Sequence, residues 1–594
     1  MHKLSSVPAD LDCSRSFQAK NINVIFSLEV NLLPLHILLA PHTMATTTPV
    51  SLDSSSSLPL SVAIPVSVGS TETVPEKLAV NRSDSSDSSV AKIEFGVARN
   101  EIDVEVPTPK APLRGPVPIP LTNLDKGLIG WESPDDPENP MNWTLKHKWR
   151  NMSLVAFSTF MLPLASTLFA PGVGYVAAEF HETNSTMLTL MVSIFVFGFG
   201  WGPMFLHAPL SELYGRKYVI ACSNLVFAIF NIGCAWANDV NTFLACRFLG
   251  GLLGCASLVV GGGVISDMFR REEMGGASSA FALGPLMGPV LGPTIGGFLA
   301  ERVGWRWTFR LLLILGCFMS AMFFFIVDET NAPAILRQKT YRKRKELGRP
   351  ELISALDEFN KRSPGQIFWH GVSRPITLLC TSPAVLFLGL YMAIAFAYLY
   401  IFLTTIAGVF TDIYHFSPGI AGLSYLGLGT GLMSALLTVG STNDKLVRYL
   451  TERNNGVRMP EFRLRPLLVS CILIPVAMMW YGWAVQRRAH WFAVVASMFP
   501  LGFGMVSSML PIQTYLIEVY GQYGLAASAT AAGNCLRMTA GAFFPLVGPT
   551  LFQHLDYGWG STLLGLLALL MCASMALTFI FFGHKLRERF PPRI

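Results

Sequence analysis

The chain has 594 residues, of which 51% are hydrophobic and only 14% are charged. Soluble domains carry about 25% charged residues, so this balance excludes an ordinary soluble protein and indicates one that crosses a membrane many times. The net charge of +6 is small and spread over loops, so nucleic acid is not implied as a partner, and the ten cysteines show no metal-ligand spacing.

The first part of the chain, residues 1–145, is predicted to be a disordered cytoplasmic tail. A stretch rich in Ser and Thr (51–89) and a later Pro-rich stretch could not bury a core. The apolar run 22–40 is interrupted by polar residues and lacks the cleavage site of a signal peptide, so we do not count it as a span. Met44 opens a more ordinary polar amino terminus, which leaves Met1 and Met44 both open as the start.

From Trp149 onward, apolar segments of about 20 residues follow one another, each long enough to cross roughly 30 Å of hydrocarbon. We therefore expect an all-α membrane protein with twelve transmembrane helices in two halves of six. The first half is expected at 146–330, a cytoplasmic central loop at 331–375, the second half at 376–584 and a short cytoplasmic tail at 585–594. The predicted spans are 152–177, 186–208, 218–237, 242–266, 278–300, 306–327, 376–406, 418–440, 466–486, 491–517, 527–550 and 560–583.

The orientation follows from the Lys and Arg residues, which gather on one side of the predicted membrane. The central loop 331–375 is densely basic, whereas the loops on the other side hold only Arg302, Arg306, Arg487 and Arg488. Because positive loops stay in the cytoplasm, both termini are expected there. The sequon at Asn184 then lies outside and is a candidate site of glycosylation.

The segment 284–297 combines glycines at every fourth position with three prolines that directly follow them. In water each interior Gly would cost a helix about 1 kcal/mol and each Pro about 3. In a membrane, neighbouring helices satisfy the freed carbonyls, and small residues let two backbones approach closely. We expect one membrane helix whose bare stripe packs against the other half of the molecule and acts as a hinge. The alternative is a tight helix crossing with no further role.

The stretch 208–217, Ala-Pro-Leu-Ser-Glu-Leu-Tyr-Gly-Arg-Lys, joins the second and third spans. Gly215 suits a sharp turn, and the cations Arg216 and Lys217 lie near Glu212. These residues are predicted to form a charge lock between helix ends that is made in one conformation and broken in another. The alternative is a solvated basic turn.

Arg247 lies about five residues into the fourth span, where a charge costs several kcal/mol and is a functional hypothesis by default. Gly250, Gly251 and Gly254 give it a small-residue face toward the bundle interior. The alternative is that the side chain extends to the nearby outer surface, which is about 8–9 Å away at 1.5 Å per residue.

Polar residues in the second half are the candidate substrate contacts, because an aromatic and amide-lined cavity suits amphipathic organic molecules. The aromatic and amide side chains could equally pack between helices, whereas the charge of Arg537 favours neutral or anionic cargo. No catalytic triad or nucleotide-binding loop is present, so we expect no enzyme activity, cofactor or metal, and energy from an ion gradient. The candidates are Tyr391, Tyr398, Gln513, Tyr515, Asn534 and Arg537.

Three of these stretches resemble motifs of the major facilitator superfamily. The loop 208–217 resembles the signature between the second and third helices, with departures at Ala208 and Glu212. Cys246–Gly251 resembles the fourth-helix motif, whose Arg is linked to proton transfer, and Asp267 at the end of that helix joins the coupling set. The stretch 288–297 matches the fifth-helix motif of antiporters. The resemblance assigns six residues to that motif: Gly288, Pro289, Gly292, Pro293, Gly296 and Gly297.

The segment 130–143, Gly-Trp-Glu-Ser-Pro-Asp-Asp-Pro-Glu-Asn-Pro-Met-Asn-Trp, resembles the entry sequence of fungal twelve-span drug:proton antiporters. The resemblance covers roughly residues 130–590. It implies a proton-coupled exporter of drugs or secondary metabolites that works by alternating access. Its implied partners are protons, a small organic substrate and the lipid bilayer, and it would act as a monomer in the plasma membrane. The alternatives are a carrier for one metabolite, such as an organic acid or a polyamine, and a transporter-like nutrient sensor.

Overall fold

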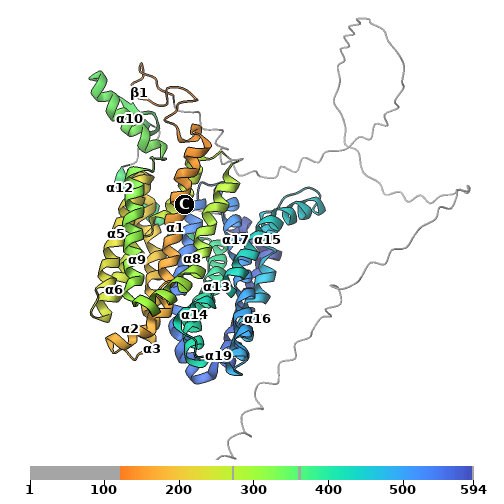
Figure 1. Ribbon diagram of the computed structural model, residues 1–594. Coiled ribbons are helices and arrows are strands. Elements are labelled where there is room, and N and C mark those ends of the chain that lie inside the picture. The colour runs from red at the N-terminus through yellow and green to blue at the C-terminus, as the bar shows by residue number, and fades with distance from the viewer. Residues whose placement is uncertain (1–120, 271–272, 359–362, 592–594) are drawn as a thin grey trace, which may run out of the picture. The chain divides into compact units, whose positions relative to one another are not determined.

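The computed structural model describes residues 121–270, 273–358 and 363–591, and this part of the chain is almost entirely helical (Figure 1). Part of the predicted tail, residues 1–120, lies outside the described residues, as do both candidate starts.

The first six crossings follow the predicted spans closely. Several of them are interrupted by short turns, and the second crossing contains the π-helical turn η3. Their elements are α1 (Leu145–Thr167), η2 (Ala170–Gly172), α2 (Val173–Phe180), α3 (Ser185–Gly202), η3 (Pro203–His207), α4 (Ala208–Tyr214), α5 (Arg216–Ala235), α6 (Val240–Leu253), α7 (Ala256–Met268), α8 (Met274–Val303) and α9 (Arg306–Phe325).

The second half has the same number of crossings, although only eleven continuous apolar helical segments are present in the described residues. The last segment, Ala526–Arg589, has 64 residues and would extend about 96 Å as one helix, several times the thickness of the hydrocarbon core. It turns back at Asp556, whose φ of 54° is not helical, so it makes two crossings. The prediction of twelve crossings is confirmed.

The elements of the second half begin with α13, which starts after the N-cap Ser382, so the seventh crossing begins later than the predicted residue 376. They are α13 (Pro383–Gly408), η4 (Val409–Ile413), α14 (Pro418–Leu423), α15 (Leu426–Arg453), η5 (Pro460–Leu464), α16 (Leu467–Gln486), α17 (Trp491–Gly521), α18 (Ala526–Phe543), η6 (Phe544–Leu546) and α19 (Val547–Arg589).

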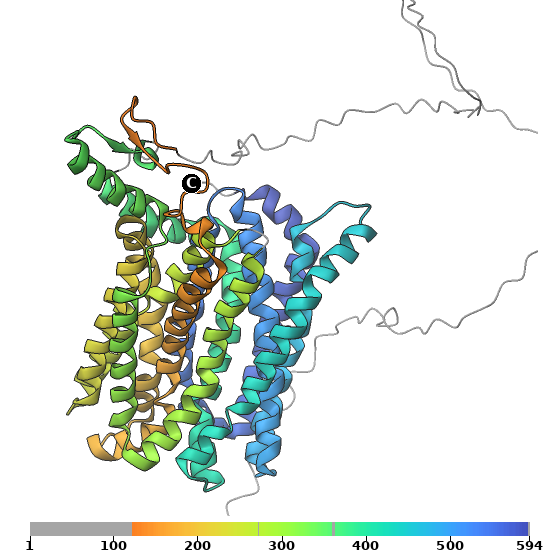
Figure 2. The same ribbon diagram turned by 45° about the horizontal axis from the view of Figure 1, so that its top comes forward.

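The region expected as a polar central loop is itself largely helical. It contains α10 (Ala332–Leu347), β2 (Ile353–Ser354) and α11 (Ala355–Glu358), and α12 (Pro364–Thr381) begins within it. Arg337 on α10 donates to the carbonyl of Leu213 at 3.2 Å, which attaches α10 to the first half. We call the side of the helix bundle where α10 lies the α10 end, and the opposite side, with α2 and α14, the α2 end (Figures 1 and 2).

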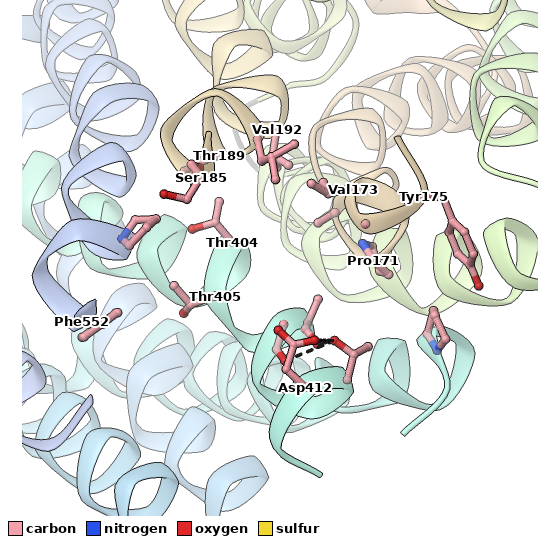
Figure 3. Close-up of a pocket in the computed structure, with 18 of the residues that line it drawn as sticks. Pro171, Val173, Tyr175, Ser185, Thr189, Val192, Thr404, Thr405, Asp412 and Phe552 are labelled. Carbon is pink, nitrogen blue, oxygen red and sulfur yellow. Dashed lines mark hydrogen bonds between the residues drawn. The ribbon is translucent and has the colours of Figure 1, made fainter. Parts of the chain in front are cut away.

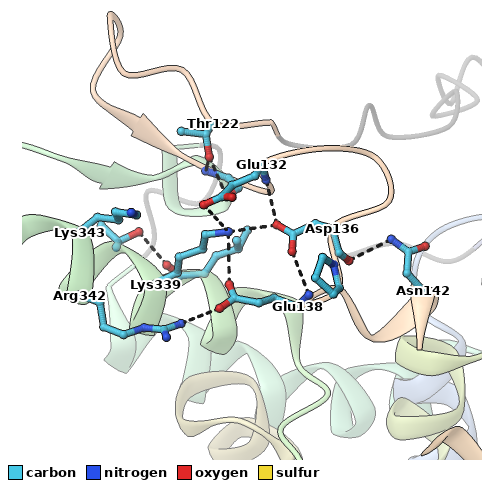
Figure 4. Close-up of polar contacts among 12 residues, drawn as sticks. Thr122, Glu132, Asp136, Glu138, Asn142, Lys339, Arg342 and Lys343 are labelled. Carbon is cyan, nitrogen blue, oxygen red and sulfur yellow. Dashed lines mark hydrogen bonds and ion pairs between the residues drawn. The ribbon is translucent and has the colours of Figure 1, made fainter. Parts of the chain in front are cut away.

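Residues 121–144, which we expected to be part of the tail, fold onto α10. Strand β1 (Leu128–Ile129) pairs in parallel with β2, and a 3₁₀ turn, η1 (Pro140–Asn142), leads into α1. Buried Lys339 of α10 contacts the carboxylates of Asp136 at 3.0 Å, Glu138 at 3.3 Å and Glu132 at 3.6 Å (Figure 4). The segment that resembles the entry sequence of drug:proton antiporters therefore fastens the central region to the start of the first half.

The two halves meet through two pairs of crossings. On one side, Trp201 of α3 donates its indole N–H to the hydroxyl of Thr539 on α18 at 2.9 Å. On the other, the hydroxyl of Thr294 on α8 donates to the carbonyl of Gly422 on α14 at 3.0 Å. The space enclosed between the halves lies between these two contacts.

Candidate functional site

A pocket of about 730 Å³ lies between the two halves at the α2 end. Side chains from α3, from the α1–α2 connection and from α13 surround it (Figure 3). Its volume is that of a small-molecule site. Most of the lining is apolar or carries hydroxyl groups, and Asp412 is the single carboxylate among the described lining residues. The polar lining comprises Tyr175, Ser185, Thr189, Thr404, Thr405, Thr411, Asp412, Gln553 and Tyr557.

Arg247 is 2% exposed, so its side chain does not extend to the surface. Its guanidinium donates to four backbone carbonyls: those of Ala165 at 2.9 Å and Ser166 at 3.4 Å on α1, and those of Met191 and Val192 on α3, both at 3.3 Å. Val192 also lines the pocket. These carbonyls hold the guanidinium in the interior, so the alternative that the side chain of Arg247 extends to the outer surface is wrong. The assigned coupling role stays a prediction.

Arg537 on α18 is also buried, at 5% exposure. Its guanidinium lies 4.8 Å from the ring centre of Phe396 and donates to the sulfur of Met509 at 3.2 Å, while its Nε has no partner in the described part of the chain. One turn earlier, the side-chain oxygen of Asn534 is likewise buried without a partner, as is the hydroxyl of Tyr515 on α17. These three residues keep unused polar groups.

The other predicted substrate contacts are arranged differently. The hydroxyl of Tyr391 donates to the carbonyl of Leu467 at 3.1 Å, and that of Tyr398 donates to the carbonyl of Leu564 at 2.7 Å. Both hydroxyls therefore serve contacts between helices of the second half. Gln513 is half-buried. None of the six predicted contacts lines the pocket, so the structure does not bring them together around it.

The predicted charge lock has different partners from those expected. Arg216 pairs with Asp267 at 3.2 Å, whereas Glu212 is exposed and has no ion pair among the described residues. Glu329, just after α9, accepts the backbone N–H groups of Arg216 at 2.8 Å and Lys217 at 3.1 Å. Glu212 lies on α4, before the chain turns at Gly215, and on that helix the guanidinium of Arg216 donates to the hydroxyl of Ser211 at 2.8 Å rather than to Glu212.

A related cluster of ion pairs lies at the α10 end of the second half. Arg463 pairs with Asp444 at 2.9 Å and also with Glu518 at the end of α17, and Arg458 pairs with Glu518 at 2.9 Å. The sequence shows these acids only as isolated residues near helix ends, so their partners could not be named. The two halves thus each join an Arg that follows a loop to an acid at a helix end, as expected of structural repeats.

The glycine stripe lies on a single helix, α8, which remains helical through Pro285, Pro289 and Pro293. A Cβ atom at Gly288 would lie 2.5 Å from Cβ of Pro163 on α1, and one at Gly296 would overlap the carbonyl of Leu168. The expectation that the stripe packs against the other half is therefore wrong. Residues beside the stripe do contact the second half: Gly297 lies against Pro418 and Gly419, and the carbonyl of Pro293 lies against Gly422.

Asn184 is the N-cap of α3, and its side-chain oxygen accepts the backbone N–H of Thr186 at 2.9 Å. The residue is exposed beside the α2 end. Its glycosylation stays a prediction.

Comparisons with known proteins agree with this architecture. The sequence model of the Major Facilitator Superfamily matches residues 155–545. The chain is 42% identical to the MFS-type transporter penM of Penicillium rubens, over 78% of this chain and 90% of that protein. It is 38% identical to the efflux pump radE of Floropilus chiversii, over 78% of this chain and 85% of that protein.

Among solved structures, the chain resembles the xylose transporter XylE from E. coli in a partially occluded inward-open conformation. The two share 15% identity with a TM-score of 0.54, over 74% of this chain and 98% of that one, a likeness that shows the fold alone. The family match and the fungal relatives together show that the chain belongs to the major facilitator superfamily and is a multi-pass membrane transporter.

Proposed function

We propose that this transporter exports small organic compounds, such as drugs or secondary metabolites, in exchange for protons and by alternating access. The observation that supports this most is the pocket, which is lined by both halves and includes Val192, whose carbonyl accepts a hydrogen bond from the buried Arg247. A site shared by two halves changes its exposure when they rock against each other. The antiporter motif on α8 and the fungal efflux relative favour export over uptake.

The helix contacts suggest how the rocking is organised. Because the glycine stripe of α8 packs on α1, these two crossings are expected to move as one body. Two contacts hold the α10 end of the first half together: the ion pair of Arg216 with Asp267, and the hydrogen bond from the backbone N–H of Arg216 to Glu329. Both would rearrange when that end opens. Arginine keeps its proton at physiological pH, so Arg247 would act in coupling through its fixed charge.

In this proposal the protein acts as a monomer in the plasma membrane with both termini in the cytoplasm. The α2 end, with the pocket and Asn184, then faces outward. The proposal that it is instead a nutrient sensor predicts dependence on residues 1–120, since a sensor needs its tail for output. Removing those residues should leave most of the export of a pump intact.

The coupling role can be tested by replacing Arg247 with Ala in the full-length chain. Compounds exported by cells that express the wild-type chain would be measured in medium and cells by mass spectrometry, with and without a protonophore. We expect Arg247→Ala to lose protonophore-sensitive export by about tenfold or more, since charge-assisted contacts contribute about 1.5–3 kcal/mol. Arg448→Ala, at an exposed position on α15, is the control. Undiminished export by Arg247→Ala, at equal membrane abundance, would refute the coupling role.

A further inference from the structure

The centre of the transporter contains two buried guanidinium groups, Arg247 from the first half and Arg537 from the second. They are 2% and 5% exposed, and within the described ranges neither forms an ion pair with an acid. Both lie on aromatic rings, Arg247 at 4.9 Å from Phe195 and Arg537 at 4.8 Å from Phe396. The middle of the molecule therefore holds two positive charges that the protein does not neutralise.

The two groups differ in how well they are satisfied. Arg247 has four carbonyl acceptors, which serve four of its five N–H donors. Arg537 has only the thioether of Met509, a poor acceptor, and its Nε is unpartnered in the part of the chain that the structure describes. A buried cation without an anion is strongly unfavourable, so Arg537 is the position at which a negative group would be most stabilised.

The two guanidinium groups are connected by a series of contacts, which crosses between the halves at one hydrogen bond. Ser166, whose carbonyl accepts from Arg247, shares a hydrogen bond of 3.1 Å with the hydroxyl of Tyr400 on α13. Tyr400 in turn lies 5.0 Å from Phe396, the ring beneath Arg537. The chain thus links α6, α1, α13 and α18 in one buried layer.

This layer forms the floor of the pocket. Thr404, which lines the pocket, lies one turn beyond Tyr400 and donates its hydroxyl to the carbonyl of Tyr400 at 2.9 Å. Between the pocket and Arg537 the halves are therefore joined by the contact of Ser166 with Tyr400. A route from the pocket to the guanidinium would require this hydrogen bond to break as the halves separate.

We propose that the exported compound is an organic anion with a carboxylate, which binds through that acid group to Arg537. This rests on the proposed export function and adds the chemical class of the cargo. A planar guanidinium can hold a carboxylate by two parallel hydrogen bonds, and once the contact of Ser166 with Tyr400 is broken, the apolar lining of the pocket would accept the remainder of the molecule. The contact of Ser166 with Tyr400 closes the site toward the pocket.

The test compares the organism that carries this chain with a strain in which the gene is deleted, and with strains re-expressing the full-length wild type, Arg537→Gln, Arg537→Lys or the control Arg448→Gln. Untargeted mass spectrometry of medium and cells identifies the compounds whose export depends on the chain, and methylation shows which carry an acidic group. We expect these compounds to be acids. Their medium-to-cell ratio should fall about tenfold in Arg537→Gln and less in Arg537→Lys, which keeps the charge.

The outcomes separate this inference from the function on which it rests. If no compound changes its distribution on deletion, the export function itself is wrong. If the exported compounds are neutral or basic, export stands and the anion proposal is overturned, whether or not the Arg537 variants fold. If acids are exported equally well by Arg537→Gln at normal membrane abundance, Arg537 is not their binding group.

Discussion

At the turn between α4 and α5, a single carboxylate organises the backbone. Glu329 accepts the N–H groups of Arg216 and Lys217, at 2.8 and 3.1 Å, and those of the two residues that follow it in sequence, both at 2.9 Å. Groups at a helix N-terminus have no partner within their own helix, and a negative charge there is favourable. Gly215 makes room for it, because any Cβ at this position would meet the carboxylate, 2.7 Å from its carbon.

Replacing Gly215 with Ala should therefore destabilise the α10 end of the first half. The backbone of Gly215 has φ of +90° and ψ of 171°, a region that costs other residues about 1–3 kcal/mol, and the new methyl group would also displace Glu329. We expect a lower Tm of the purified protein in detergent. Gly262→Ala on α7, where a Cβ meets no atom within 4 Å, is the control and should not lower Tm. Equal Tm values for the two variants would contradict this account of the turn.

The predicted charge lock around Arg216 shows which features of single residues can be predicted from sequence and which cannot. The residue types were foreseeable, since a turn glycine followed by two cations stands out in an apolar chain. The resemblance had placed Asp267 in the coupling set, but its pairing with Arg216 was not foreseen, because Glu212 is near Arg216 in sequence while Asp267 and Glu329 are near it only in space. Side-chain direction after a turn depends on the geometry of the turn, which residue spacing does not contain.

At the scale of elements, α8 shows a similar limit. Its glycine spacing predicted a helix with one face that lacks side chains, and the structure has such a helix with the glycines along one face. The neighbour of that face could not be predicted, because any helix can occupy a surface without side chains. The contact is so close that the hydroxyl of Thr167 on α1 donates to the backbone carbonyl of Gly288 at 3.4 Å.

Replacing Gly296 with Ala should separate α8 from α1. The added Cβ would overlap the carbonyl of Leu168, and overpacking of this kind costs about 1–3 kcal/mol. We expect a lower Tm and, because α1 provides carbonyls to Arg247, weaker export. Gly276→Ala on the same helix, where a Cβ would meet nothing within 4 Å, serves as the matched control. A variant at Gly296 that behaves like the one at Gly276 would argue against rigid α1–α8 contact.

The attachment of residues 121–144 to α10 can be tested through Lys339. Replacing it with Met leaves buried Asp136 without its ion pair, a change that costs about 3 kcal/mol when the pair is buried. We expect faster proteolysis and faster amide exchange in the segment around Asp136. Lys345→Met, at an exposed position of α10 without an ion pair among the described residues, should change neither rate.

The same contact has a defined pH dependence. Burial opposes ionisation of Asp136, but the backbone N–H groups of Glu132 and Glu138 and the Lys339 ammonium outweigh it and lower the pKa. Burial also opposes the charge of Lys339, and its carboxylate partners outweigh that and raise the pKa. The stability from Asp136 is lost as pH falls below about 3.9, and that from Lys339 as pH rises above about 10.4. Amide exchange, corrected for its intrinsic rate, should therefore show constant protection between about pH 5 and 9.

At the scale of the whole molecule, hydropathy was sufficient to predict twelve crossings in two halves, because the length of each apolar run is set by the bilayer. Even the break near Asp556 appeared as a gap between two predicted spans. The pocket could not be predicted, since its lining comes from turns and helix ends in both halves, and polar residues there do not stand out from ordinary loops. Conversely, mid-span residues such as Tyr391 stand out in the sequence and yet serve contacts between helices.

The orientation of the whole transporter can be tested with cysteines placed at its two ends. Asp412→Cys lies in the pocket at the α2 end, and Lys345→Cys is exposed on α10 at the other. If the basic central region is cytoplasmic, a membrane-impermeant maleimide should label the cysteine at position 412 in intact cells. It should label the one at position 345 only after the cells are permeabilised. The unsubstituted chain measures labelling of its own cysteines. Labelling of position 345 in intact cells would show that the orientation is the opposite of the one expected and that the pocket faces the cytoplasm. Export through this pocket would then begin, rather than end, at the α2 end.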